Sequence, residues 1–110
     1  MPKLRVLFVP NQYTDHEGDT EVIAEFPLSP AGGTDGLLSI GRHRDVILPT
    51  GEQISVMCEV TRYGNYFHAY HNDVCICRLR TAGRIELVLR LPTGNEFLAQ
   101  LLGVEGPARE

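Results

Sequence analysis

The sequence predicts an all-β fold, an antiparallel β-sandwich of eight or nine short strands. Apolar and polar residues alternate with a period of two along most of the chain, and no segment sustains a helical period. Clusters rich in Gly, Pro, Asn and Asp separate the alternating segments, as turns do. The expected strands are residues 4–9, 21–26, 37–41, 45–48, 53–62, 66–71, 74–79, 84–89 and 96–102.

The boundaries in the first half of the chain follow from turn chemistry. Pro10 ends the apolar first strand, and the acidic, polar segment 11–20 connects it to residues 21–26. A second long connection, residues 29–36, is rich in Gly and Pro and leads to the strand that ends at Gly41. Pro49-Thr50-Gly51 then ends the short strand 45–48. Long loops on a rigid sheet often carry function, although both are equally compatible with plain solvated connectors.

The second half of the chain repeats shorter strand–turn units. Tyr63-Gly64-Asn65 ends the longest alternating segment, and Asn72-Asp73 is expected to be the two-residue turn of a hairpin. Residues 81–83 and 92–95 precede the last two strands. We therefore expect one domain over residues 1–104 and a frayed polar tail over 105–110.

The motif Leu-Pro-Thr-Gly occurs twice, at 48–51 and at 91–94, each time several residues after a Gly-Arg pair. The apolar patterns between these points agree only loosely. We interpret the repeat as turn chemistry used twice and not as a duplication.

Composition restricts the function classes. Ten basic and fourteen acidic residues give a net charge of −4, which argues against nucleic acid as a partner. No apolar run approaches the ~20 residues of a membrane span, so no membrane contact is expected. Three cysteines without a spaced framework indicate a reducing compartment, and we expect a cytoplasmic protein. No cofactor is expected.

The order of motifs from residue 38 to residue 103 resembles the forkhead-associated (FHA) domain, a β-sandwich that binds phosphothreonine peptides. Gly41-Arg42 resembles the family's Gly-Arg pair, Ser55 its phosphate-binding serine, and Asn72 the asparagine that holds the peptide backbone. The segments 45–48 and 91–97 and the closing Gly103 also resemble the family's pattern. Cys58 stands at the family's histidine position and Asp73 at its glycine position, so the resemblance is to a degenerate FHA domain.

A candidate anion site can also be argued from the residues alone. Arg42 and Arg44 lie at a loop, where guanidinium groups bind phosphate oxygens in a bidentate way. The hydroxyl of Ser55 would add a donor. The alternative is that both arginines are solvated loop charges and Ser55 is an ordinary strand residue.

The hairpin around Asn72 concentrates reactive side chains. With Asn72-Asp73 as its turn, His71 should pair with Val74 and His68 with Cys77, which puts five side chains on one face: Tyr66, His68, Tyr70, Cys75 and Cys77. His68, Cys75 and Cys77 could hold a metal or act in thiol redox chemistry, with Cys58 as a fourth ligand. The alternative, buried core cysteines, is more typical of free thiols, so we predict no metal. No catalytic motif is present, and we expect no enzyme.

Tyrosines near this hairpin predict a contact surface. Tyr63, Tyr66 and Tyr70 can offer large contact areas at little cost in entropy. The alternative is a half-buried sheet face without a partner.

These observations lead to a non-enzymatic protein-interaction module that binds a protein or phosphoprotein, with Arg42, Arg44, Ser55 and Asn72 as candidate contacts. The alternative is a small phage or mobile-element β protein that inhibits a host defence complex or forms part of a virion, acting through a sheet face or edge. The oligomeric state is open, although an edge strand such as residues 4–9 could pair across a dimer.

Overall fold

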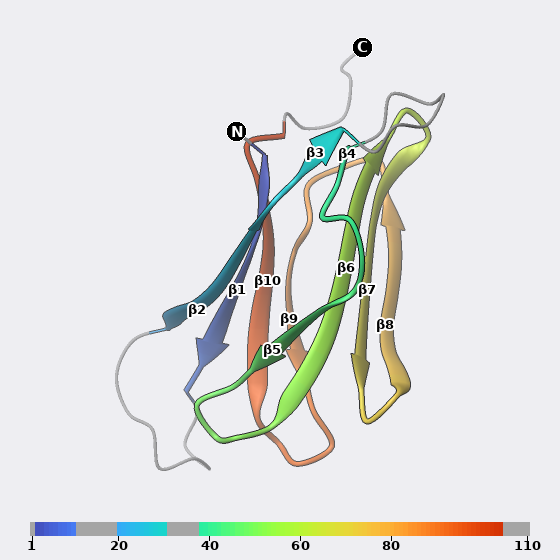
Figure 1. Cartoon of the computed structure of the whole chain (residues 1–110). Coiled ribbons are helices and arrows are strands. Elements are labelled where there is room, and N and C mark those ends of the chain that lie inside the picture. The colour runs from blue at the N-terminus through green and yellow to red at the C-terminus, as the bar shows by residue number, and fades with distance from the viewer. Residues whose placement is uncertain (1, 11–19, 31–37, 105–110) are drawn as a thin grey trace.

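Two antiparallel sheets pack face to face in a computed structural model that describes residues 2–10, 20–30 and 38–104 (Figure 1). The four-stranded sheet has the order β2-β1-β10-β9. Its strands are β1 (Lys3–Val9), β2 (Glu21–Pro27), β9 (Glu86–Arg90) and β10 (Glu96–Leu102). The second sheet has the order β3-β4-β6-β7-β8, and β5 also pairs with β6. Its strands are β3 (Ser29–Pro30), β4 (Leu38–Ser39), β5 (Arg44–Ile47), β6 (Gln53–Thr61), β7 (Gly64–His71) and β8 (Val74–Thr81). The predicted all-β sandwich is confirmed.

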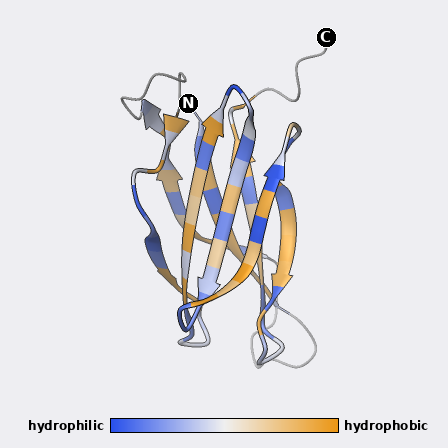
Figure 2. Cartoon of the chain, turned by 90° about the vertical axis from the view of Figure 1, so that its right-hand side faces the viewer, coloured by the Kyte–Doolittle hydropathy of each residue, from blue (hydrophilic) through white to orange (hydrophobic). Residues whose placement is uncertain are grey.

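The core lies between the two sheets and is built from the apolar positions of the period-two pattern. β1 and β10 contribute Leu4, Val6, Phe8, Phe97 and Ala99 from one side, and β6 and β7 contribute Ile54, Val56, Cys58, Phe67 and Ala69 from the other. Figure 2 shows this alternation as hydrophilic and hydrophobic bands along the strands. Burying each large apolar side chain contributes roughly 1.5–3 kcal/mol, so the alternation is the main source of stability.

Most predicted strands are present, with small shifts at their ends. The β6–β7 turn is Arg62-Tyr63, because Thr61 pairs with Gly64, so it begins one residue earlier than predicted. β3 was not expected, and β9 begins at Glu86 instead of residue 84. Most of the two long connections and the predicted tail, residues 105–110, lie outside the described residues.

One prediction about sheet order is wrong. Residues 4–9 are not an edge strand, because β1 lies between β2 and β10 and pairs with both. A central strand has a hydrogen-bonded neighbour on each side, and even Leu7, which is on the outer face, is only 9 % exposed.

The two Leu-Pro-Thr-Gly segments form the same turn. In each, the leucine N–H donates to the carbonyl of the residue four positions on, and the glycine N–H donates to the leucine carbonyl, at 2.7–2.8 Å. Gly51 and Gly94 have φ of 95° and 97°, a left-handed conformation that favours glycine. The repeat is therefore one turn design used in both sheets.

Glu52 links these two turns across the sandwich. Its carboxylate accepts hydrogen bonds from Thr50 Oγ1 (3.1 Å), Thr93 Oγ1 (2.6 Å) and Asn95 Nδ2, and His71 Nε2 lies 3.7 Å away. Burial raises the pKa of Glu52, but the hydrogen bonds and the charge of His71 outweigh it, so the pKa lies below the ordinary value of 4.5. One side chain thus joins the β5–β6 turn, the β9–β10 turn and the end of β7.

We expect Glu52→Ala to lower the free energy of unfolding by about 1–3 kcal/mol, because the donors around it lose their acceptor. The contribution of a carboxyl whose pKa is lowered on folding is complete above the unfolded pKa and is lost as pH falls through the folded pKa. Wild type should therefore lose more stability between neutral pH and pH ~3 than Glu52→Gln does. Urea unfolding at both pH values measures this.

Glu59→Gln, the same change of charge within β6, is the control and should keep the wild-type pH dependence. Equal stability of Glu52→Gln and wild type at both pH values would contradict the role of Glu52.

Candidate functional site

A tight hairpin turn positions the polar residues at one end of β7 and β8. Asn72 and Asp73 have φ of 53° and 63°, and His71 pairs with Val74 across them. Two consecutive left-handed residues define a type I′ turn, which Asn and Asp tolerate better than most residues. The predicted two-residue turn is confirmed, and it carries Asp73.

A β-bulge follows this turn and changes the predicted faces. The register of β7 and β8 shifts between Ala69 and Tyr70, so that Tyr70 pairs with Cys75 but Ala69 pairs with Cys77. His68 pairs with Arg78, and the predicted His68–Cys77 pair is wrong. The extra residue on β8 returns Cys77 to the inner face beside buried Ala69.

The bulge separates the side chains that were candidates for metal or redox chemistry. His68 and exposed Cys75 lie on the outer face, whereas Cys77 packs against the core and Cys58 is fully buried within it. The shared face predicted for His68, Cys75 and Cys77 is therefore wrong for Cys77. Within the described ranges, no group of three or more His, Cys, Asp or Glu side chains is arranged to hold a metal ion.

The three thiols should differ sharply in reactivity, because only the thiolate reacts. Burial and the nearby Glu59 carboxylate raise the pKa of Cys58 to about 12, and burial and Cys75 raise that of Cys77. Cys75 should be alkylated first, Cys77 more slowly, and Cys58 only on unfolding. Iodoacetamide labelling followed by peptide mass spectrometry checks the order, with urea-unfolded protein as the control. Early labelling of Cys77 would contradict the bulge.

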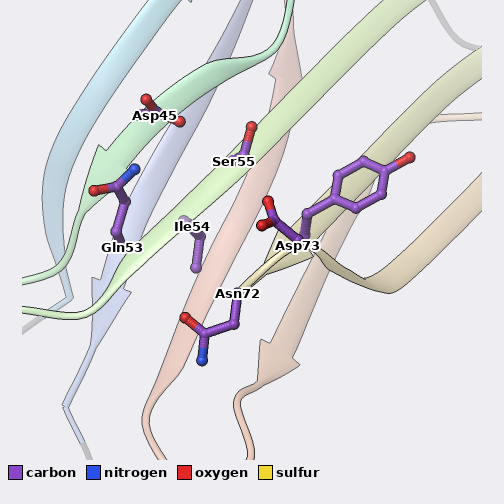
Figure 3. Close-up of a pocket in the computed structure, with 7 residues that line it drawn as sticks. Asp45, Gln53, Ile54, Ser55, Asn72 and Asp73 are labelled. Carbon is purple, nitrogen blue, oxygen red and sulfur yellow. The ribbon is translucent and has the colours of Figure 1, made fainter.

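A hollow of about 350 Å³ opens on the outer face of the six-stranded sheet, between β5, β6 and the β7–β8 turn (Figure 3). Among the described residues, its lining includes two carboxylates and no Lys or Arg: Asp45, Gln53, Ile54, Ser55, Tyr70, Asn72 and Asp73. A hollow of about 380 Å³, lined by His43, Ser55, Tyr70 and Asp73, shares three of these residues. The site is acidic.

Strand register sets the centre of the hollow. Asp45 pairs with Ser55 across β5 and β6, and Ser55 pairs with Tyr70 across β6 and β7. The three side chains therefore form one row on the outer face, and Figure 3 shows Ser55 between Asp45 and Asp73. The ring of Tyr70 meets the ring of His43 edge-on, with centroids 5.3 Å apart.

The structure brings together only half of the residues expected to bind an anion. Ser55 and Asn72 line the hollow, but Arg42 and Arg44 do not. Arg44 donates from Nε and Nη2 to the carbonyl of Ile40 (3.4 and 3.2 Å), and its Cζ lies 5.7 Å from the centre of the Phe26 ring. It thus packs against β2 of the other sheet as a cation–π contact. Arg42 is exposed in the bend between β4 and β5.

Sequence reasoning missed Asp45 and Gln53, although a signal for both was present. With residues 48–52 as the β5–β6 turn, counting back along β5 and forward along β6 puts Asp45 opposite Ser55 and Ile47 opposite Gln53. The FHA resemblance directed attention to the arginines of this segment instead.

The three tyrosines that were expected to form a contact surface occupy two different places. Tyr66 and Tyr70 are half-buried on the outer face of β7, whereas Tyr63 is 63 % exposed in the β6–β7 turn. Cross-strand rows extend this face: Tyr66 lies between Glu59 and Arg80, and His68 lies between Met57 and Arg78. The face runs from the acidic hollow to a basic margin on β8.

No protein-family model, no curated protein and no solved structure matches this chain. In the part of the chain that the structure describes, no helix is long and apolar enough to cross a membrane.

Proposed function

We propose that this chain is a non-enzymatic protein-interaction module that binds a partner through the outer face of its six-stranded sheet, with the hollow receiving a basic side chain. The observation that carries the proposal is the pair of carboxylates, Asp45 and Asp73, on either side of Ser55 in a hollow that no Lys or Arg lines within the described part of the chain.

The chemistry of the lining fits a guanidinium or ammonium group. Carboxylates are the strongest acceptors for such donors, and charge-assisted hydrogen bonds are about twice as strong as neutral ones. The amide oxygens of Gln53 and Asn72 add neutral acceptors, and the ring of Tyr70 offers a face to a cation. A phosphate in the hollow would lie between two carboxylates, which carry the same sign of charge as the phosphate. The guanidinium of Arg44 is held against Ile40 and Phe26 instead. The FHA resemblance thus supports an interaction module more than a phosphothreonine reader.

The rest of the face supplies contact area. Tyr66, His68 and Met57 lie side by side beyond the hollow and are all half-buried. Aromatic residues and methionine are enriched at the centres of protein interfaces.

The three cysteines are free, in keeping with a partner in a reducing, cytoplasmic setting.

A phage or mobile-element inhibitor of a host complex would use the same face. Its binding to a folded complex, instead of to a linear peptide, would distinguish this alternative from a peptide-binding module.

Titration of ¹⁵N-labelled protein with three peptide pools tests the proposal. The pools share degenerate flanks and carry Lys/Arg, phosphothreonine or alanine at the centre. The basic pool should shift the amides of Asp45, Ser55, Tyr70 and Asp73 most strongly. Asp45→Asn and Asp73→Asn should each weaken binding by about two- to fivefold, and added salt should weaken wild-type binding further, because these charges are exposed.

The matched control is Glu21→Gln, which removes one carboxylate from the edge strand β2 on the other sheet and should leave binding unchanged. Shifts seen only with the phosphothreonine pool and centred on Arg42 would overturn the proposal and favour an FHA-type reader.

A further inference from the structure

The free edges of the two sheets differ in how they are protected. The four-stranded sheet ends at β2 and β9, and the six-stranded sheet ends at β8 and at the short strands β3 and β5. Since β2 contacts β5, the edges of β8 and β9 share the opposite side of the sandwich. Unprotected edges are templates for pairing with another chain.

Some backbone N–H and C=O groups of β9 have no hydrogen-bonding partner among the described strands of the sheet and point to its free edge. Leu91 N–H donates to the carbonyl of Asn95, and Leu101 N–H donates to the carbonyl of Ile85, so odd-numbered residues of this strand bond to β10. Backbone groups alternate in direction along a strand. The N–H and C=O groups of Glu86, Val88 and Arg90 therefore point to the free edge.

The sequence of β9, Glu-Leu-Val-Leu-Arg, is complementary to itself when antiparallel. A two-fold axis perpendicular to the sheet keeps each face on its own side, so one residue must pair with its own copy across the axis. Only an axis at Val88 pairs all five residues. It places Glu86 opposite the partner's Arg90, and Val88 opposite its own copy.

We propose that two copies of this chain pair antiparallel through β9, with the two-fold axis at Val88, and so continue the four-stranded sheet across a dimer. Glu86, Val88 and Arg90 would exchange backbone hydrogen bonds with the partner. Val88 is 53 % exposed, and the side chains of Glu86 and Arg90 are 52 % and 66 % exposed, so all three can reach across. The ion pair of Arg90 with Glu96 (3.3 Å) lies along the same row and extends the charge pairing.

The other long edges disfavour self-pairing. On β8, Arg78 and Arg80 share the outer face, so antiparallel pairing of two copies around Leu79 would bring like charges together, and the bulge interrupts the register. β2 carries Glu21 and Glu25 and ends at Pro27, all features that protect an edge.

The side of the sandwich beside β9 also holds apolar surface that a second copy would cover. Leu87 and Leu89 of β9 and Cys77 and Leu79 of β8 pack against the core but stay half-buried. An interface of five paired residues is small, so the dimer should be weak and dependent on concentration.

Sedimentation equilibrium across a wide range of chain concentration tests the proposal. The mean mass of wild type should rise from 12.2 kDa toward twice that value. Val88→Lys should weaken association by on the order of tenfold, because two ammonium groups would meet at the axis. Glu86→Arg should also weaken it, and adding Arg90→Glu should restore part of it, because the charges across the axis are again opposite although Glu96 loses its ion pair with Arg90.

Val74→Lys is the matched control, since Val74 is another exposed valine (62 %) at the edge of β8, and it should associate like wild type. Circular dichroism of each variant confirms folding. A wild type that stays at 12.2 kDa at every concentration, or a dimer that Val88→Lys leaves intact, overturns the proposal.

Discussion

The carboxylate of Glu52 is the contact on which the arrangement at this end of the sandwich depends. It receives hydrogen bonds from the β5–β6 turn of one sheet and from the β9–β10 turn of the other. It also lies beside His71 at the end of β7. The β5–β6 turn fixes the pairing of Asp45 with Ser55, and His71 leads directly into the turn that carries Asp73. The geometry of the acidic hollow therefore depends on Glu52, a half-buried residue that does not line the hollow itself.

Local sequence predicted most of the fold because alternation and turn chemistry are local properties. The I′ turn at Asn72-Asp73 and the paired Leu-Pro-Thr-Gly turns needed only a few neighbouring residues to specify them. Sheet order is a long-range property, so residues 4–9 were wrongly expected at an edge. The bulge on β8 was missed because period-two counting assumes an unbroken ladder, and Cys75-Ile76-Cys77 contains no Gly to mark the extra residue.

The candidate site was predicted only in part, because side chains alternate between the two faces of β5 and the prediction did not take this alternation into account. Arg44, Val46 and Leu48 occupy alternate positions and so lie on the same face of the strand. Val46 and Leu48 are buried, which shows that this face is turned toward the core. Arg44 therefore had to turn inward, where Phe26 and the Ile40 carbonyl accommodate its guanidinium. Asp45 has the opposite parity and faces the hollow. The FHA resemblance rested on Gly41-Arg42 in this segment, but strand parity determines which charged side chain of β5 faces outward.

The positions of the hollow and of β9 make the two proposed surfaces compatible. The hollow lies on the outer face of the six-stranded sheet near β5, whereas β9 is the far edge of the other sheet. A copy bound at β9 would leave the hollow open, and the dimer would present two hollows related by the two-fold axis. Exposed carboxylates bind a single cation weakly, because water screens the charge. Two linked hollows on a partner with two basic segments would gain affinity through effective concentration, without any new contact within either site.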